Sequence, residues 1–543
     1  MPSTKRPPDR GPTFDRRTIL RTGLAATGVA LGGVFSPPAI LRAAQDDAQP
    51  QRGGQLDVAL ARLPVGTSIA GVRRPEAGWI GSLCHDTLFV PTMTADTSSV
   101  GDTTLTNGIA IAPAWNADRT GLTFAVRSGV VFPDGSLLTA TDVVASIEHA
   151  QNHAAQDGAA WRFEHLDRIE AASNGVTITL TQPDAAFTAC MADPAIPILP
   201  AATLAARSSW TIADLPAGSG PFIPGTVANG ERFGFDANDL FWQIGRPRLR
   251  GLTVTGIEED TERTVALVSG AADMIVDAPL LDIRSLREDT NITLVGGPSN
   301  RACVLLTNYQ RGATADRRLR RLIAEAVDRS AIVRYAAAKE AADEQTLFPK
   351  ASWPGLDEPP KPSDWAASRD LLTSLGYPIG VPLRLIADER DGSAANAAVL
   401  IQEQLSYVGI AITLDLLDEQ ALRRTLANRD YDLFITYTPA WLDPHELVRP
   451  LIHSEGPDNL MGYSNSLVDR LIERAIADPD QATRAEIYQH IQQILLTEVP
   501  LIVLFFPNYY DAMTSRLQEY GWYPPVRAIG MRTAWLKRAT PSS

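Results

Sequence analysis

Between positions 316 and 505 the apolar residues switch repeatedly from helical to strand spacing, and this alternation restricts the fold more than any other feature. One predicted helix begins behind Asp316, which can cap its first turn, and another ends at Gly409. Residues 410–416 then alternate as a half-buried strand. Repeated helix and strand predict an α/β unit in which helices cover a sheet. Further strands are expected at 431–437 and 501–505, and further helices at 468–475 and 487–495.

The first half of the chain differs in character. Residues 56–300 are richer in strand-like and turn-rich stretches, and a first strand is expected at 56–60 after a linker at 50–54. A chain of 543 residues predicts about three compact units or two large lobes. We therefore expect the first half to form a lobe different from the second.

The N-terminal segment has the pattern of an export signal. A basic region with the adjacent pair Arg16 and Arg17 precedes a mild apolar run at 22–34, and Ala43 and Ala44 mark the expected processing region. The arginine pair resembles a twin-arginine signal, which exports folded proteins. The alternative is an uncleaved membrane anchor, although the run is short for a bilayer span of about 20 residues.

Charge and cysteine content exclude several classes of protein. The formal net charge is −14, and it becomes −19 once residues 1–44 are removed. So acidic a chain lacks the basic surface that nucleic-acid backbones require, and we expect a soluble protein outside the cytoplasm that binds no nucleic acid. The cysteines Cys84, Cys190 and Cys303 are too far apart for a zinc ribbon or an iron–sulfur cluster. One disulfide is possible but not required.

No catalytic motif is evident. The sequence has no G-x-S-x-G, no H-E-x-x-H and no phosphate-binding loop with its lysine, so we expect neither an enzyme nor a cofactor. His149 and His153 could share a metal ion on one helix face, but a solvated helix face is the favoured interpretation and we expect no metal. The glycine-rich residues 218–221 are interpreted as a turn.

Four groups of segments support one interpretation, within a resemblance that runs from about residue 53 to residue 515. They are 114–116 with 122–130, 132–135 and 138–143; 218–222 (Gly-Ser-Gly-Pro-Phe) with 238–242; 267–273 with 316–329; and 371–377 with 404–410, 431–433 and 443–444. In order and spacing they resemble the family 5 extracellular solute-binding proteins, the dipeptide, oligopeptide and nickel class that serves ABC importers.

The resemblance implies an α/β fold, the two-lobe periplasmic binding protein of type II, cluster C-like, with a hinge and an extra subdomain in the first lobe. The expected divisions are an export signal at 1–44, lobe I at 45–300 with the subdomain at about 80–200, lobe II at 301–497, and a return to lobe I at 498–543. The protein would be a periplasmic monomer that captures a small, peptide-like organic solute between its lobes and delivers it to permease subunits with their ATPase.

Several alternatives remain open at this point. Within the class, the ligand could be an opine, a modified amino acid, an oligosaccharide or a metal chelate. Outside the class, the chain could be an exported enzyme or a sensory binding module. An enzyme would need a catalytic pair in the cleft, whereas a sensor and a transporter would be alike in sequence.

The resemblance also implies ligand-binding residues at strand ends. Peptide-binding relatives carry Trp-x-Gly-Asp where this chain has Tyr437, Pro439 and Ala440, so the carboxylate that holds a ligand's ammonium group is missing unless Asp443 or Glu446 replaces it. The other candidates share a position near a strand end or the lobe crossover: Arg390 as a carboxylate clamp (or a solvated loop arginine), Tyr437 and Trp441 as stacking residues (or core residues), and Thr67 and Asn308 as polar contacts.

Overall fold

The computed structural model describes residues 50–63, 75–92 and 104–537, except 157, 174, 208–209, 212–213, 229–231, 378–379 and 523–526. The predicted export signal with Arg16 and Arg17 lies outside these residues. Within the described part, no helix combines the length and the apolar character needed to cross a membrane. Cys84, Cys190 and Cys303 are all buried and form no disulfide.

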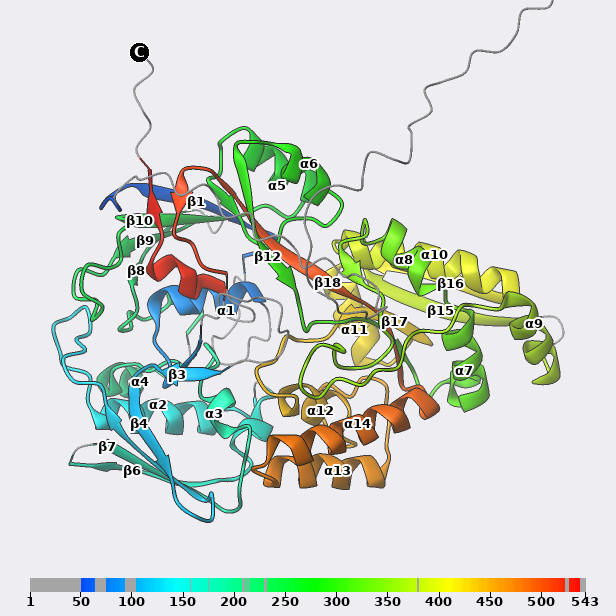
Figure 1. Ribbon diagram of the computed structural model, residues 1–543, viewed down its shortest axis with the longest axis horizontal. Coiled ribbons are helices and arrows are strands. Elements are labelled where there is room, and N and C mark those ends of the chain that lie inside the picture. The colour runs from blue at the N-terminus through cyan, green and yellow to red at the C-terminus, as the bar shows by residue number, and fades with distance from the viewer. Residues whose placement is uncertain are drawn as a thin grey trace, which may run out of the picture. The chain divides into compact units, whose positions relative to one another are not determined.

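A mixed sheet of twelve strands organises the described chain, and its fold is α/β as predicted. Ten of its strands follow one another in the order β16-β15-β17-β13-β18-β11-β1-β10-β9-β8, while β12 and β14 pair with β18 (Figure 1). Pairing is parallel from β15 to β16 and β17, and from β1 to β10 and β11. Since parallel strands require crossover connections, helices cover the sheet.

The longest strand, β18 (Leu501–Thr514), joins the two halves of this sheet. Its residues 501–505 pair with β13, and its residues 508–514 pair with β12. The strand predicted at 501–505 is therefore only the first part of a longer one. Here we call the half from β13 to β16 the second lobe and the half from β11 to β8 the first lobe; β18 belongs to both (Figure 1).

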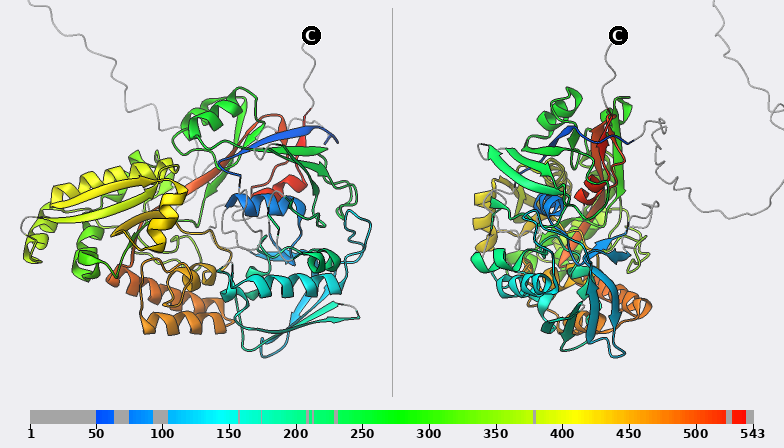
Figure 2. Two further views of the ribbon diagram at one scale, coloured as in Figure 1. Left: turned by 180° about the vertical axis from the view of Figure 1, so that it is seen from behind. Right: turned by 90° about the vertical axis from the view of Figure 1, so that its left-hand side faces the viewer.

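Helices cover both faces of the second lobe's sheet (Figures 1 and 2). Along β13, Cys303 and Leu305 face a core formed with α7 to α10, whereas Val304 and Leu306 face a core formed with α12 to α14. The strands are β13 (Cys303–Thr307), β14 (Ala341–Ala342), β15 (Val381–Asp388), β16 (Ile410–Leu417) and β17 (Leu433–Tyr437). The helices are α7 (Arg317–Ala326), α8 (Arg329–Tyr335), α9 (Trp365–Ser374), α10 (Gly392–Val408), α11 (Glu419–Ala427), α12 (His445–Leu451), α13 (Ser466–Ala477) and α14 (Gln481–Glu498), with a 3-10 turn at Gly312–Ala315.

Two helix ends in this lobe confirm their sequence signals. The Asp316 carboxylate accepts a hydrogen bond from the Arg318 backbone N–H and caps α7. Gly409 ends α10 with φ +95°, a left-handed conformation that glycine adopts without steric cost. These local signals hold because they depend on neighbouring residues alone.

The first lobe contains the other half of the large sheet. Leu56, Val58 and Leu60 of β1 pack into its main core, and Ala59 faces the helices α5 and α6. The strands are β1 (Gln55–Leu60), β8 (Phe222–Ala228), β9 (Arg232–Ala237), β10 (Gly251–Gly256), β11 (Met274–Ile275), β12 (Ile292–Pro298), β19 (Leu517–Gln518) and β20 (Trp535–Leu536). The helices are α1 (Pro75–Cys84), α5 (Asp260–Val268) and α6 (Ile283–Glu288), with a 3-10 helix at Arg527–Arg532.

A separate antiparallel sheet, in the order β4-β5-β7-β6, has its own apolar core with α2 and α3. Its elements lie mostly within the range of about 80–200 expected for an inserted subdomain. The strands of this sheet are β4 (Ala110–Trp115), β5 (Gly121–Val126), β6 (Leu166–Ala172) and β7 (Gly175–Leu180). The strands β2 (Phe89–Pro91) and β3 (Leu105–Asn107) pair in a sheet of their own. The helices of this part are α2 (Ala140–His153), α3 (Phe187–Cys190) and α4 (Ala201–Ala206), with a 3-10 helix at Ala160–Phe163.

Asp86 binds side chains from two of the segments that resemble the family, 218–222 and 238–242. Its buried carboxylate accepts hydrogen bonds from Ser219 and from the indole of Trp242, both at 2.9 Å, and pairs with Arg532 at 2.8 Å. A Cβ at Gly220 would lie 2.4 Å from the carbonyl carbon of Cys84. The glycine-rich segment is therefore a close-packed turn, as predicted.

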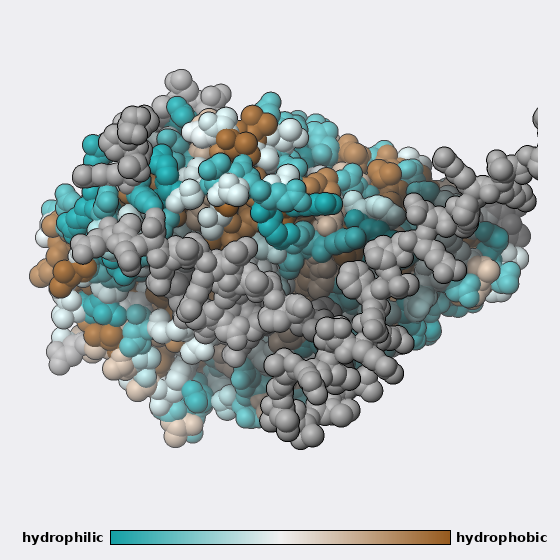
Figure 3. Space-filling model, turned by 45° about the horizontal axis from the view of Figure 1, so that its top comes forward, coloured by the Kyte–Doolittle hydropathy of each residue, from teal (hydrophilic) through white to brown (hydrophobic). Residues whose placement is uncertain are grey.

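On the face drawn in Figure 3, hydrophobic residues form small patches that are separated by hydrophilic residues. Single exposed apolar residues, such as Ile244 and Leu137, are common on folded proteins and need no partner. The main apolar surface is instead buried in the cores described above.

Candidate functional site

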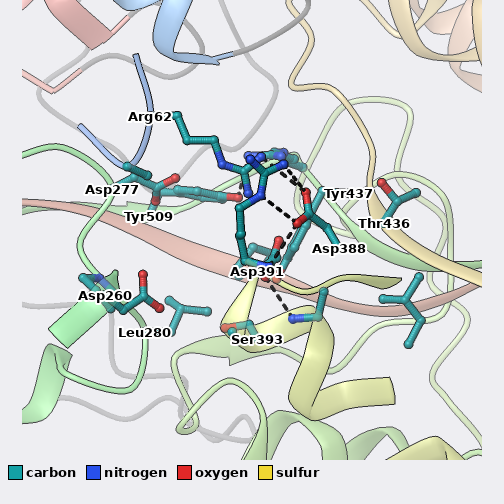
Figure 4. Close-up of a pocket in the computed structure, with 18 of the residues that line it drawn as sticks. Arg62, Asp260, Asp277, Leu280, Asp388, Asp391, Ser393, Thr436, Tyr437 and Tyr509 are labelled. Carbon is teal, nitrogen blue, oxygen red and sulfur yellow. Dashed lines mark hydrogen bonds and ion pairs between the residues drawn. The ribbon is translucent and has the colours of Figure 1, made fainter. Parts of the chain in front are cut away.

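A cavity of about 370 Å³ lies where the two lobes meet. Its walls come from the residues after β1, β11 and β15, from the first turns of α5 and α10, and from β17 and the middle of β18. In Figure 4, Asp277 and Tyr509 lie on one side of this pocket, and Asp388, Thr436 and Tyr437 lie on the other. Ends of strands meeting at one edge are a common position for ligand sites in α/β folds.

The described lining is charged, with both signs present. Asp388 contacts two arginines: Arg62 lies 3.3 Å from it (Figure 4), and Arg390 lies 3.2 Å from it. Partial burial opposes ionisation of Asp388, but the hydrogen bonds from Arg390 and the charges of Arg62 and Arg390 outweigh it and lower its pKa. The acidic side chains are Glu76, Asp260, Asp277, Asp388 and Asp391, and the basic ones are Arg62, Arg263, Arg301 and Arg390.

Arg390, the predicted carboxylate clamp, lines the pocket but is already paired. Its guanidinium contacts Asp388 at 3.2 Å and Glu419 at 3.4 Å. Two carboxylates therefore compensate its single positive charge. The structure places Arg390 at the site, while much of its capacity to bind an anion is used within the protein.

Arg301 has a different environment, although the sequence prediction did not include it. Its Nε donates to the Thr438 carbonyl at 3.1 Å, and its Nη1 donates to the Tyr509 hydroxyl at 2.9 Å. Its guanidinium also lies 4.9 Å from the ring centre of Tyr437 and 5.7 Å from that of Tyr509. These partners are all neutral.

Asp391 and Asp277 each take part in a hydrogen bond between a backbone N–H and a carboxylate. Asp391 caps α10 by accepting a hydrogen bond from the Ala394 N–H at 2.9 Å, and burial raises its pKa despite that bond and the nearby Arg301. Asp277 has φ +59°, and its N–H donates to the Asp511 carboxylate at 3.0 Å. Asp277 follows β11 and Asp391 precedes α10, and the ends of both elements form part of the pocket.

The aromatic candidates separate in the structure. Tyr437, at the end of β17, lines the pocket, and burial raises its pKa well above the ordinary value. Trp441 is fully buried, packs edge-on against Phe348 at 5.3 Å, and does not line the pocket. Core packing, the alternative left open for Trp441, is the environment that the structure shows.

Three polar positions from the sequence prediction are also engaged elsewhere. Asp443 pairs with buried Arg484 at 2.6 Å, and the Glu446 carboxylate accepts from the Leu442 N–H at 2.7 Å. Asn308 donates to the carbonyls of Arg429 and Tyr431, so it holds the turn before β17. None of these three is among the pocket residues, and Thr67 lies outside the described residues.

Three of the charged pocket residues that the prediction missed share one sequence signal. Arg62, Asp277 and Asp391 each stand within three residues after the carboxyl end of a strand, where the ends of neighbouring strands converge. Arg301 stands just before β13, on the opposite strand end, and nothing in its local sequence marks it. Only the antiparallel pairing of β13 with β17 and β18 brings it to the pocket.

The histidine pair proposed as a weak metal candidate forms a stacked contact. The rings of His149 and His153 lie 4.3 Å apart, and His149 also lies 5.3 Å from Trp210. Among the described residues, no group of three or more His, Cys, Asp or Glu side chains is placed to hold a metal ion. The two histidine rings pack against each other and against Trp210.

Comparison with solved structures identifies the class of the fold. A complex of AgaA with agropinic acid from A. tumefaciens R10 aligns with a TM-score of 0.78 and 22% identity, covering 90% of this chain and 99% of that one. AppA from Bacillus subtilis, in complex with a nonapeptide, aligns with a TM-score of 0.77 and 21% identity, covering 90% and 100%. Together they show the two-lobe α/β fold of the periplasmic binding proteins.

The sequence comparison then identifies the family. The profile of the bacterial extracellular solute-binding proteins, family 5, matches residues 104–459, and the chain belongs to this family. It is 25% identical over 438 residues to the probable D,D-dipeptide-binding periplasmic protein DdpA of Escherichia coli K12, covering 77% of this chain and 83% of that protein. It is 26% identical over 440 residues to the glutathione-binding protein GsiB of the same strain, covering 79% and 86%.

Membership defines the general role. The protein is a solute-binding protein of ABC importers, a class that binds small solutes and works with permease and ATPase subunits. Its relatives are periplasmic binding proteins rather than enzymes.

Proposed function

We propose that the pocket between the lobes captures one small, polar, peptide-like solute for delivery to a membrane permease. The supporting observation is the pocket itself: about 370 Å³, bounded by both lobes and lined by charged groups of both signs. This volume is at the lower end of the range of about 300–1,000 Å³ for small-molecule sites. It favours a solute the size of a dipeptide or tripeptide over a long peptide.

Binding energy in such a protein stabilises the closed arrangement of the lobes. Arg62 of the first lobe and Asp388 of the second are already in contact, so closure brings charged groups of both lobes around the solute. We further propose that the protein carries out no reaction on the solute and releases it unchanged.

A non-peptide acid, such as an opine, is a second candidate, and one observation favours it. Asp443 and Glu446, the two residues that could replace the carboxylate missing at Ala440, are both hydrogen-bonded away from the pocket. A free ammonium group at that position would therefore lack its usual partner, and an uncompensated buried charge costs several kcal/mol. The fold shared with AgaA, which was solved with agropinic acid, is compatible with this candidate.

Mass spectrometry of small molecules released from the purified protein tests both candidates. A set of short peptide masses would support the peptide-like solute, and one discrete non-peptide mass would support the second candidate. Recovery of a reaction product after incubation with that same solute would contradict the proposal that no chemistry takes place.

We also propose export through the twin-arginine pathway and a monomeric state. Replacing Arg16 and Arg17 with lysine should retain the protein in the cytoplasm, as measured by cell fractionation, whereas unchanged export would contradict the proposed route. Light scattering during size-exclusion chromatography should give a mass below that of the 58.6 kDa full chain once the signal is removed. A mass near twice that value would contradict the monomer.

A further inference from the structure

We propose that Arg301 is the anchor for a carboxylate group of the solute. This inference rests on the proposed function, because it assigns the chemistry of the solute to one residue of the same pocket. It also moves the expected carboxylate contact from Arg390 to a residue that local sequence does not mark.

The first argument is the state of the four arginines in the described lining. Arg62 contacts Asp388 at 3.3 Å, and Arg263 contacts Asp260 at 2.5 Å. Arg390 contacts Asp388 and Glu419. Arg301 alone has no described carboxylate within 4.0 Å, so it is the one pocket arginine whose positive charge lacks a contacting anion in the described chain.

The second argument is the geometry of the Arg301 side chain. A guanidinium carries five N–H donors, and this one uses its Nε and Nη1 on the Thr438 carbonyl and the Tyr509 hydroxyl. The remaining donors make no hydrogen bond with a described residue. An arginine fork of this kind matches the two oxygens of a carboxylate.

The third argument is preorganisation. The two hydrogen bonds and the rings of Tyr437 and Tyr509 fix the guanidinium at the edge of the pocket before a solute arrives. A side chain that is already ordered loses little conformational entropy on binding. The aromatic rings attract the guanidinium but carry no negative charge, so the positive charge of Arg301 has no contacting carboxylate in the described chain.

Two carboxylates near Arg301 restrict which other chemical groups the solute can carry. Asp277 and Asp391 line the same pocket and lie close enough to interact electrostatically with Arg301, although neither is within 4.0 Å. They would repel a second anionic group and attract a cationic or hydrogen-bond-donating group. The expected solute therefore combines a carboxylate with such a group, as amino-acid-derived compounds do.

Thermal-shift measurements and calorimetry on the full chain test the inference with defined probes. The probes are a mixture of dipeptides, glutathione and agropinic acid, each also supplied as its methyl ester. We expect at least one free acid to raise the Tm of the wild type while its ester does not. Arg301→Gln should weaken binding of that acid about 100-fold or more, because removing one partner of a buried charge pair has a large effect.

Further variants keep the test independent of folding. Arg301→Lys retains the charge but not the planar fork, and it should bind the acid more tightly than Arg301→Gln and more weakly than the wild type. Arg390→Gln should weaken binding less than Arg301→Gln, since its charge is already compensated. Arg284→Gln on α6, with an exposed side chain, is the control and should bind as the wild type does.

The outcomes separate the two proposals. An ester that binds as tightly as its acid, or an Arg301→Gln protein that binds the acid unchanged, overturns the role of Arg301 and leaves the proposed function intact. A wild-type protein that binds none of the acids or esters overturns the proposed small peptide-like or opine-like solute, and the inference fails with it.

Discussion

Arg62 at the end of β1 donates a hydrogen bond to Asp388 at the end of β15, at 3.3 Å and across 326 positions of sequence. The pair joins the two lobes, and both residues line the shared pocket. Arg390 contacts the same carboxylate, so Asp388 binds one arginine from each lobe. Gly392 belongs to the same junction, because a Cβ there would lie 3.2 Å from the Asp260 carboxylate of α5.

Asp388→Asn should reduce stability only while the carboxylate is ionised. The pKa of Asp388 is lowered in the folded protein, because the bonds and charges of its arginines outweigh its partial burial. Its contribution is therefore present above the unfolded-state pKa of about 3.9 and is lost as the pH falls through the lower folded value. We expect a difference of about 1 kcal/mol or less at pH 7, since both partners are partly exposed.

The measurement is the Tm of both proteins from pH 2.5 to pH 7. The two curves should converge at low pH, and a constant separation over the whole range would contradict the assignment. Asp357→Asn, at an exposed surface ion pair, serves as the control and should change the curve little.

Tyr437 and Trp441 should respond to substitution in opposite ways. Tyr437→Leu removes a pocket ring beside Arg301 and should weaken solute binding with a small change in Tm. Trp441→Phe should lower the unfolding free energy by about 1–3 kcal/mol, because it leaves space in a core, and should keep the dissociation constant. Calorimetry with the solute released from the wild type, together with thermal unfolding, measures both effects. A Trp441→Phe protein with altered affinity and unchanged Tm would instead place this ring at the solute.

Gly220→Ala should destabilise the protein by about 2–4 kcal/mol. Its Cβ would come within 2.4 Å of the Cys84 carbonyl carbon, and relief would disturb the hydrogen bond from the Gly220 N–H to the Cys84 carbonyl. Gly78→Ala is the matched control: it lies within α1, and its nearest neighbour would be 4.0 Å away. Urea unfolding should show the control as neutral or up to about 1 kcal/mol more stable, because alanine favours helix. Equal effects at the two positions would contradict the close-packed turn.

Glu446→Gln should change how stability depends on pH. Burial, aided by the nearby Asp193, raises the pKa of Glu446 to about 7. The unfolded chain releases this proton near pH 4.3, whereas the folded protein keeps it until about pH 7, so stability falls as the pH rises between these values. The variant lacks this loss and should gain about 1–3 kcal/mol relative to the wild type between pH 4.5 and pH 8. Urea unfolding at both pH values measures the gain, and parallel behaviour of the two proteins would show that Glu446 is ionised when folded.

The segments that identify the family mostly stabilise the fold rather than contact the pocket. Ser219 and Trp242 bind buried Asp86, and Asp316 caps α7. These residues act on a buried carboxylate and on a helix cap, so their roles are structural. They can therefore be recognised in a sequence without revealing what the protein binds.

The sequence by itself determined the α/β class, the main helices and strands of the second lobe, the cap at Asp316 and the stop at Gly409, because each of these depends on residues a few positions apart. Only the tertiary structure decided that Tyr437 and Arg390 line the pocket while Trp441, Asp443 and Asn308 are buried in packing. It also decided that Arg301 joins the pocket, since strands far apart in the sequence bring it there. Burial and partner choice are properties of those long-range contacts, which local spacing does not encode.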